Sequence, residues 1–174
     1  PLDAPPPGLR TAGNRLEDLE ENEEASAASL EASIGTLVHR CLELIVRQGL
    51  DAWPAHRLDS LTPGWRRWLQ AQGHDETQAA QGASEALTAL RTTLDSATGR
   101  WLLADHESGA AEQAWSSRDG DVAVNHVIDR IFIADGVRWI IDYKTVRVPV
   151  EELPARAEGF RVQLERYAGL FAGD

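Results

Sequence analysis

Asp129, Asp142 and Lys144 are the residues of this chain whose types and spacing best suit chemistry. Sixteen of the seventeen basic residues are arginines, so the single lysine indicates a position that needs a compact ammonium group rather than a planar guanidinium. Two carboxylates held close together attract a hard divalent cation, because Mg²⁺ and Mn²⁺ prefer oxygen ligands. A cation beside an ammonium group is suited to phosphodiester hydrolysis, since both stabilise the negative charge that develops on a phosphate.

The turn Asp135–Gly136 predicts how these side chains meet. It separates two runs rich in Val, Ile and Phe, which is a strong signal for a hairpin with a two-residue turn. With that turn, Asp129 falls directly opposite Asp142, and Lys144 shares their side of the sheet because residues two apart on a strand share a face. A one-residue change in the turn would destroy this alignment. The alternative is a purely structural role, in which Lys144 bridges the two aspartates at the rim of the sheet.

Helices are expected on both sides of these strands. Apolar residues recur with helical spacing from Ser33, a suitable cap, to about Gln48, and the alanine-rich stretch 75–97 is strongly helix-forming. This order of elements predicts an α/β (α+β) fold, in which a central sheet with an antiparallel meander is flanked by helices. The expected divisions are a linker or disordered acidic segment at 1–28 and one domain at 29–174. That domain would comprise a helical part at 33–104, the meander at 111–145 and a final helix at 155–172.

The composition limits the classes of protein to consider. At 174 residues the chain fits one domain, and an apolar content of 43% is enough for a core. No apolar run approaches the roughly 18 residues of a membrane span, and the N-terminus does not resemble a signal segment, so we expect a cytoplasmic protein without a membrane partner. The single cysteine, Cys41, excludes an internal disulfide and a cysteine-ligated iron–sulfur cluster.

The net charge of −11 argues against tight DNA binding by this chain alone. Much of the excess lies in one acidic run at 17–24, and bound cations would offset the carboxylates of a metal site. The charge is therefore compatible with DNA that a neighbouring domain delivers. The start at Pro1 and the absence of methionine likewise suggest a piece of a larger protein.

Several other polar residues have an ordinary interpretation beside a functional one. His39 lies within an apolar helical pattern, where a lone histidine is more often a hydrogen-bonded core residue than a ligand. Gln163 and Tyr167 are four apart on the last helix and share a face, which is also common on amphipathic surfaces. Glu112 opens the first strand, either as a further acid of the site or as a solvated edge residue. Arg130 points to the opposite face from the acids and is expected to be structural.

Four short motifs follow one another over most of the chain. They are Gly35-Thr36-Leu37-Val38-His39, Ile128-Asp129-Arg130, Ile140-Ile141-Asp142-Tyr143-Lys144-Thr145 and Gln163-Leu164-Glu165-Arg166-Tyr167. Together they resemble the PD-(D/E)XK nucleases, most closely the RecB-like nuclease domain of bacterial AddA/RecB-type (UvrD-like) helicase–nucleases. The Gly-x-x-x-His and Gln-x-x-x-Tyr signatures of that group both match, while Ile128 stands where the family name has proline.

The resemblance implies a restriction-endonuclease-like core with a mixed central sheet, and a final strand that would lie beyond Asp174. The implied metal ligands are His39, Asp129, Asp142 and the backbone carbonyl of Tyr143. The implied catalytic residues are Asp129, Asp142, Lys144, Gln163 and Tyr167. Lys144 would position or help deprotonate the attacking water, and Gln163 and Tyr167 would orient the site or contact the DNA backbone. The expected cofactor is Mg²⁺ or Mn²⁺, in a branch without an iron–sulfur cluster.

The same resemblance implies a metal-dependent deoxyribonuclease, an exonuclease at the C-terminal end of a bacterial helicase–nuclease in double-strand break repair and recombination. Single-stranded DNA would arrive from a fused ATP-dependent helicase domain, and a second helicase–nuclease subunit would be a partner. Two alternatives remain. One is a non-catalytic nuclease-like module that binds DNA or a partner chain, and the other is a stand-alone exonuclease of phage or restriction type.

Overall fold

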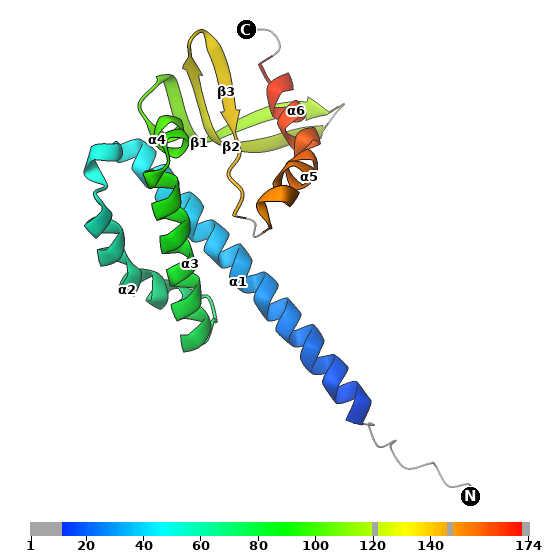
Figure 1. Ribbon diagram of the computed structural model, residues 1–174. Helices are drawn as coiled ribbons and strands as arrows, with labels where there is room; N and C mark the ends of the chain where they lie inside the picture. Colours follow the sequence, from blue (N-terminus) through cyan, green and yellow to red (C-terminus); the bar gives the residue numbers. More distant parts are fainter. Residues whose placement is uncertain (1–11, 120–121, 146–147, 172–174) are drawn as a thin grey trace, which may run out of the picture.

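A long helix and a three-stranded sheet organise the residues that the computed structural model describes, 12–119, 122–145 and 148–171 (Figure 1). The α-helices among them are α1 (Ala12–Gln48), α2 (Ala55–Ala71), α3 (Glu76–Asp95), α4 (Ala97–Leu103), α5 (Leu153–Glu158) and α6 (Arg161–Gly169). The strands are β1 (Glu107–Asp119), β2 (Val122–Ala134) and β3 (Val137–Ile141), and short 3-10 turns are η1 (Leu50–Ala52) and η2 (Val150–Glu152). This order confirms the expected α/β class.

Helix α1 begins much earlier than the sequence predicts. The prediction of a start capped by Ser33 is wrong, because the helix runs from Ala12, and the Ser33 hydroxyl lies 2.9 Å from Nε2 of His74. Residues 12–28, expected to be linker or disordered, are therefore helical, which the high helix propensity of their alanines and glutamates explains. The expected end at Gln48 is confirmed: Gly49 follows with φ 82°, a left-handed conformation that glycine adopts without strain.

The helical core packs α1 against α2 and α3. Its centre consists of apolar side chains with at most 1% of their surface exposed, and each such side chain contributes about 1.5–3 kcal/mol of burial free energy. They include Ile45, Leu58, Leu69 and Leu90. Gly82 lets α3 approach closely, since a Cβ atom there would lie 3.0 Å from Leu69 Cδ1 and 3.1 Å from Leu30 Cδ1. This rigid layer fixes the path of α1 past the sheet.

The sheet is an antiparallel meander in the order β1-β2-β3, and the described residues contain no parallel strand. The predicted turn at Asp135–Gly136 is confirmed, with φ 52° and 74°, as a two-residue hairpin turn with two positive φ angles requires. Ala134 pairs with Val137, and the pairing continues to Arg130 and Ile141. Asp119–Gly120 is a second Asp-Gly pair between strand-like runs and likewise predicts a turn, but Asp119 belongs to β1, and Gly120 lies outside the described residues.

Helices cover both faces of the sheet. On one face, Trp101 of α4 packs edge-on against Phe132 and Trp139, at ring-centroid distances of 5.3 and 4.9 Å. On the other, Tyr167 of α6 packs against Ile131. The single final helix expected at 155–172 is instead two helices, and Gly159 with Phe160 forms the break between them. In the described part of the chain, no helix combines the length and apolar character needed to cross a bilayer.

Candidate active site

The site lies where β3 separates from β2. The last pair of the ladder is Arg130 with Ile141, and the next position in the same register would place Asp129 opposite Asp142. At this position the link between the strands is a hydrogen bond to a side chain rather than to the backbone. The backbone N–H of Tyr143 donates it to Asp129 Oδ2 over 2.7 Å. The aspartate thus holds the two strands together at the point where their ladder ends, and the predicted register of the acids is confirmed up to this step.

Asp142 is the more enclosed of the two acids. Its side chain is 8% exposed, and its Oδ2 lies 2.5 Å from Nζ of Lys144. Its Oδ1 accepts a hydrogen bond of 3.1 Å from Nε2 of Gln163. The Lys144 contact is an ion pair, and Oδ2 accepts no well-directed hydrogen bond from the described residues. A buried carboxylate oxygen with an unused lone pair is a position that a cation would satisfy.

Helix α6 reaches the same carboxylate through a short chain of hydrogen bonds. Gln163 Nε2 also contacts the Tyr167 hydroxyl at 2.7 Å, and that hydroxyl donates to the backbone carbonyl of Val127 over 3.2 Å. Gln163 and Tyr167 therefore connect Asp142 to the backbone of β2. Their spacing of four residues places both side chains on the face of α6 that meets the sheet.

His39 brings α1 to the other acid. Its Nδ1 lies 3.4 Å from Asp129 Oδ1, and its ring meets that of Tyr143 edge-on at 5.8 Å. The hydrogen bond to Asp129 raises the pKa of His39, with further contributions from the charges of Asp129 and Asp142 and from a hydrogen bond with the Tyr143 backbone. Since that last bond raises the pKa, the imidazole donates and the Tyr143 carbonyl accepts.

Glu112 completes a group of three ligating side chains. Ligand atoms of His39, Glu112 and Asp129 all lie within 4.8 Å of one another, and the described residues contain no other such group of histidine, cysteine and acidic side chains. The pairs on either side of Glu112 place it opposite Asp129 across β1 and β2. Its φ of 51° is a left-handed conformation that costs a non-glycine residue about 1–3 kcal/mol. Burial and the negative charges of Asp129 and Glu43 raise its pKa.

These residues fit a divalent cation. The imidazole of His39 and the carboxylates of Glu112 and Asp129 come within 4.8 Å of one another, and the two carboxylates repel each other unless positive charge intervenes. Lys144 offsets one negative charge, through its ion pair with Asp142. The donor set of carboxylate oxygens, one imidazole and one peptide carbonyl suits Mg²⁺ or Mn²⁺.

The structure places the side chains expected in the site in two neighbouring groups. Asp142, Lys144, Gln163 and Tyr167 form one, and His39 and Asp129 form the other, with Glu112 added. The sequence left Glu112 undecided between a further acid of the site and a solvated residue at the edge of the sheet. The observed pair of Asp119 with Val122 places it opposite Asp129.

Arg130 holds elements of the fold together, in agreement with the structural role expected for it. It is 2% exposed, and its guanidinium donates to the carbonyls of Leu102 over 3.0 Å and Ala104 over 2.6 Å at the end of α4. A cation at the C-terminal end of a helix also meets the negative end of the helix dipole. Arg130 thus fastens α4 to the face of the sheet that is turned away from the acids.

Comparison with known proteins identifies a family for this chain. Residues 12–174 match the family model described as the PD-(D/E)XK nuclease superfamily, which covers nearly the whole chain. No curated protein and no solved structure matches the chain.

Proposed function

Because the chain belongs to the PD-(D/E)XK nuclease superfamily, we propose that it is a Mg²⁺- or Mn²⁺-dependent deoxyribonuclease that hydrolyses phosphodiester bonds. The observation that carries the proposal is the meeting of Asp129, Asp142 and Lys144 at the end of the β2–β3 ladder, beside His39. An acid pair, an ammonium group and an imidazole in a partly buried place are the parts that metal-assisted hydrolysis needs.

The cation would be held by Asp129 and Asp142, with His39 and the Tyr143 carbonyl as further ligands and Glu112 close enough to join them. When bound there, it would supply a Lewis acid that lowers the pKa of a water molecule and offsets charge on the scissile phosphate. The bond from the Tyr143 N–H orients Asp129, and the bond from Gln163 orients Asp142. Such outer contacts set ligand geometry and affinity in metal sites.

Lys144 is the residue placed to act on the phosphate. Its ammonium group is held between Asp142 Oδ2, 2.5 Å away, and the ring of Phe160, whose centroid is 4.8 Å away. One third of the side chain remains exposed, so a substrate oxygen can reach the ammonium group. In that position it stabilises negative charge in the transition state and positions the attacking water.

The proposal also includes a cellular role in DNA repair. The Gly-x-x-x-His and Gln-x-x-x-Tyr signatures support an exonuclease domain fused to an ATP-dependent helicase of bacterial double-strand break repair, with a second helicase–nuclease subunit as partner. The charge of −11 supports delivery of the DNA by another domain, because a chain with a net negative charge repels the phosphate backbone overall.

A cleavage assay tests the proposal. End-labelled single- and double-stranded DNA are incubated with the chain and Mg²⁺ or Mn²⁺, with EDTA as the metal-free control. We expect cleavage by the wild type and a loss of about 10²–10³-fold in Lys144→Ala, as for other removed transition-state donors, with a comparable loss in Asp142→Asn. The matched control is Asp51→Asn, an exposed carboxylate on η1, which should cleave like the wild type. DNA binding without cleavage by the folded wild type would favour a non-catalytic module.

A further inference from the structure

A pocket of about 300 Å³ lies on the α5–α6 side of Lys144. Asp142 and Lys144 form one wall, and Leu153, Arg156, Ala157, Phe160 and Leu164 form the rest. The pocket is therefore continuous with the candidate active site. Its volume is at the lower end of the range for ligand sites, which suits one small planar group.

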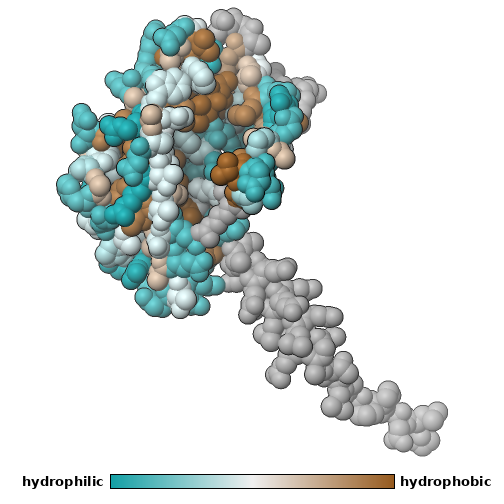
Figure 2. Space-filling model, viewed as in Figure 1, coloured by the Kyte–Doolittle hydropathy of each residue, from teal (hydrophilic) through white to brown (hydrophobic). Residues whose placement is uncertain are grey.

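The pocket combines an aromatic ring with two cations. The ring of Phe160 has Lys144 Nζ at 4.8 Å from its centroid and Arg156 Cζ at 5.8 Å. Figure 2 shows apolar surface on the face where β3, α5 and α6 lie, and Leu153 and Leu164 at this pocket are 43% and 37% exposed. An aromatic face between apolar walls stacks a nucleobase, while guanidinium and ammonium groups bind the adjoining phosphates.

Arg156 is the arginine that lines this pocket, and like the exposed Arg40, Arg66 and Arg166 it forms no ion pair within the part of the chain that the structure describes. Arg47, Arg91 and Arg161 each form an ion pair with a nearby carboxylate. The contact of Arg156 is with the Phe160 ring. In a chain of net charge −11, an unpaired guanidinium beside the site is a feature that an anionic ligand would use.

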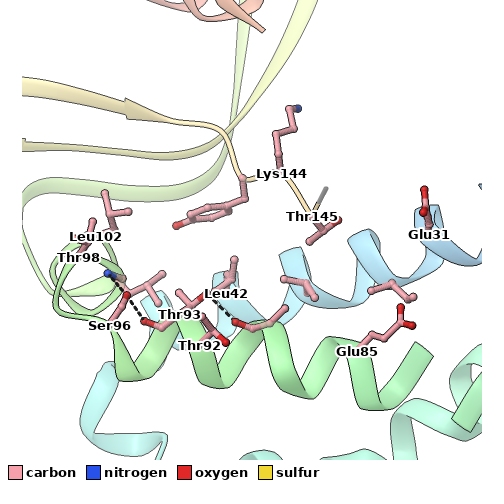
Figure 3. A pocket seen from close by; sticks show the side chains of 16 residues that line it. Glu31, Leu42, Glu85, Thr92, Thr93, Ser96, Thr98, Leu102, Lys144 and Thr145 are labelled. Atoms are coloured by element: carbon pink, nitrogen blue, oxygen red, sulfur yellow. Dashed lines mark hydrogen bonds between the residues drawn. The ribbon is translucent and has the colours of Figure 1, made fainter. Parts of the chain in front are cut away.

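The larger pocket, of about 460 Å³ between α1, α3 and α4, has the wrong charge for this ligand. Glu31 and Glu85 lie at one end of it, and the ammonium group of Lys144 points away from it (Figure 3). Two of its hydroxyl groups already donate hydrogen bonds to backbone carbonyls, Thr93 to Ala89 and Ser96 to Thr93. Two carboxylates at the rim would repel a phosphate backbone, so the strand is expected on the α5–α6 side of Lys144.

We propose that Phe160 and Arg156 form a subsite for the unpaired nucleotide next to the scissile phosphate. The base stacks on Phe160, and its phosphate binds Arg156 while the scissile phosphate lies at Lys144. A base within a duplex has to leave its stack to reach the ring, which costs a few kcal/mol, whereas a single strand offers its bases freely. The subsite therefore favours a single strand over a duplex, in agreement with the single-stranded DNA that the resemblance implies. This inference rests on the proposed nuclease function for its biological meaning.

The test measures binding separately from cleavage. Fluorescence anisotropy of a labelled single strand and of the matching duplex is recorded with the 174-residue chain in Ca²⁺, and cleavage kinetics are recorded in Mg²⁺. We expect Phe160→Ala to weaken single-strand binding about tenfold, within the range for loss of one base–aromatic stack, and Phe160→Trp to retain it. Arg156→Ala should weaken binding and lower its salt dependence, while Arg156→Lys retains most of that dependence. In cleavage, Arg156→Ala should raise KM and leave kcat nearly unchanged, whereas Phe160→Ala should raise KM and also lower kcat, because it removes the ring that holds the Lys144 ammonium group.

Arg161→Ala is the matched control, because this exposed arginine is already paired with Glu158. It should bind the single strand as the wild type does. The subsite is overturned if folded Phe160→Ala and Arg156→Ala bind the single strand like this control, or if the wild type prefers the duplex. Absence of cleavage in the wild type contradicts the nuclease proposal alone, since the binding comparison still decides the subsite.

Discussion

A Cβ atom on Gly35 of α1 would lie 3.1 Å from Oγ1 of Thr145, the residue that follows Lys144. This helix therefore passes very close to the segment that carries the lysine. One turn further along the same face, His39 reaches Asp129. The Gly-x-x-x-His signature thus has a geometric meaning: the glycine permits the close approach, and the histidine uses it to enter the site.

Gly35→Ala should preserve the fold and slow cleavage. The added methyl group displaces Thr145 by a few tenths of an ångström, and we expect a loss of about tenfold in kcat, because a 1 Å misplacement can cost 10²-fold. The double variant Gly35→Ala/Thr145→Ala removes the contact and should recover most of the rate. Full activity in the single variant, or no recovery in the double variant, would show that this contact does not position Lys144.

Gln163 and Tyr167 should act as one unit on Asp142. Gln163→Ala removes the donor to Asp142 Oδ1, and Tyr167→Phe removes the hydroxyl that fixes Gln163. We expect each to lower kcat and the double variant to lose less than the product of the two losses. A double-mutant cycle on cleavage rates measures this, with an expected coupling of about 0.5–3 kcal/mol. Strict additivity would mean that the two side chains contribute independently.

Glu112→Gly should separate metal binding from stability. Glycine adopts φ 51° without strain, so the metal-free chain should lose little stability or gain up to about 1 kcal/mol in urea unfolding. Loss of the carboxylate should weaken Mn²⁺ binding about tenfold or more, as measured by titration calorimetry. Glu112→Gln is the matched variant, in which the backbone strain stays and the ligand charge goes. Unchanged Mn²⁺ affinity in both variants would exclude Glu112 from the metal site.

The stability of the metal-free chain should depend on the protonation state of His39. Its pKa in the folded chain is raised above 6.5, so the folded state binds the proton more tightly than the unfolded state does. The resulting stabilisation is fully present below pH 6.5 and is lost as the pH rises through the raised folded pKa. Urea unfolding across this window should show the loss in the wild type and a flatter profile in His39→Gln. If the wild type became more stable as the pH rises, and His39→Gln did not, this would contradict a raised pKa of His39 in the folded chain.

The hairpin that carries the acids was predictable because its signal is local. Asp135–Gly136 requires two positive φ angles, a short turn leaves no freedom in the pairing, and the register of Asp129 and Asp142 follows. The place of Glu112 was not predictable in this way, because Asp119 pairs with Val122 and belongs to β1, whereas the Asp-Gly signal predicts that Asp119 is a turn residue. A shift of two residues in the register of β1 and β2 leaves Glu112 on the same face of the sheet and changes the residue opposite it.

The contacts made by helices were predicted only in part. The spacing of Gln163 and Tyr167 places them on one face, but their bonds to Asp142 and to the backbone of β2 depend on how α6 packs on the sheet. The approach of His39 to Asp129 likewise depends on the path of α1, which the helical core fixes over long distances in the sequence. Such tertiary relationships enter a sequence-based prediction only through the family resemblance.

Anomalous diffraction from crystals soaked in Mn²⁺ tests the central claim most directly. The account predicts one or two Mn²⁺ peaks coordinated by the carboxylates of Asp129 and Asp142, with His39 as a further ligand and Lys144 beside them. Asp129→Asn should abolish the peak in crystals of the same form. Mn²⁺ bound only elsewhere, or no peak between the two aspartates of the wild type at saturating Mn²⁺, would contradict the claim that this strand register builds a metal site.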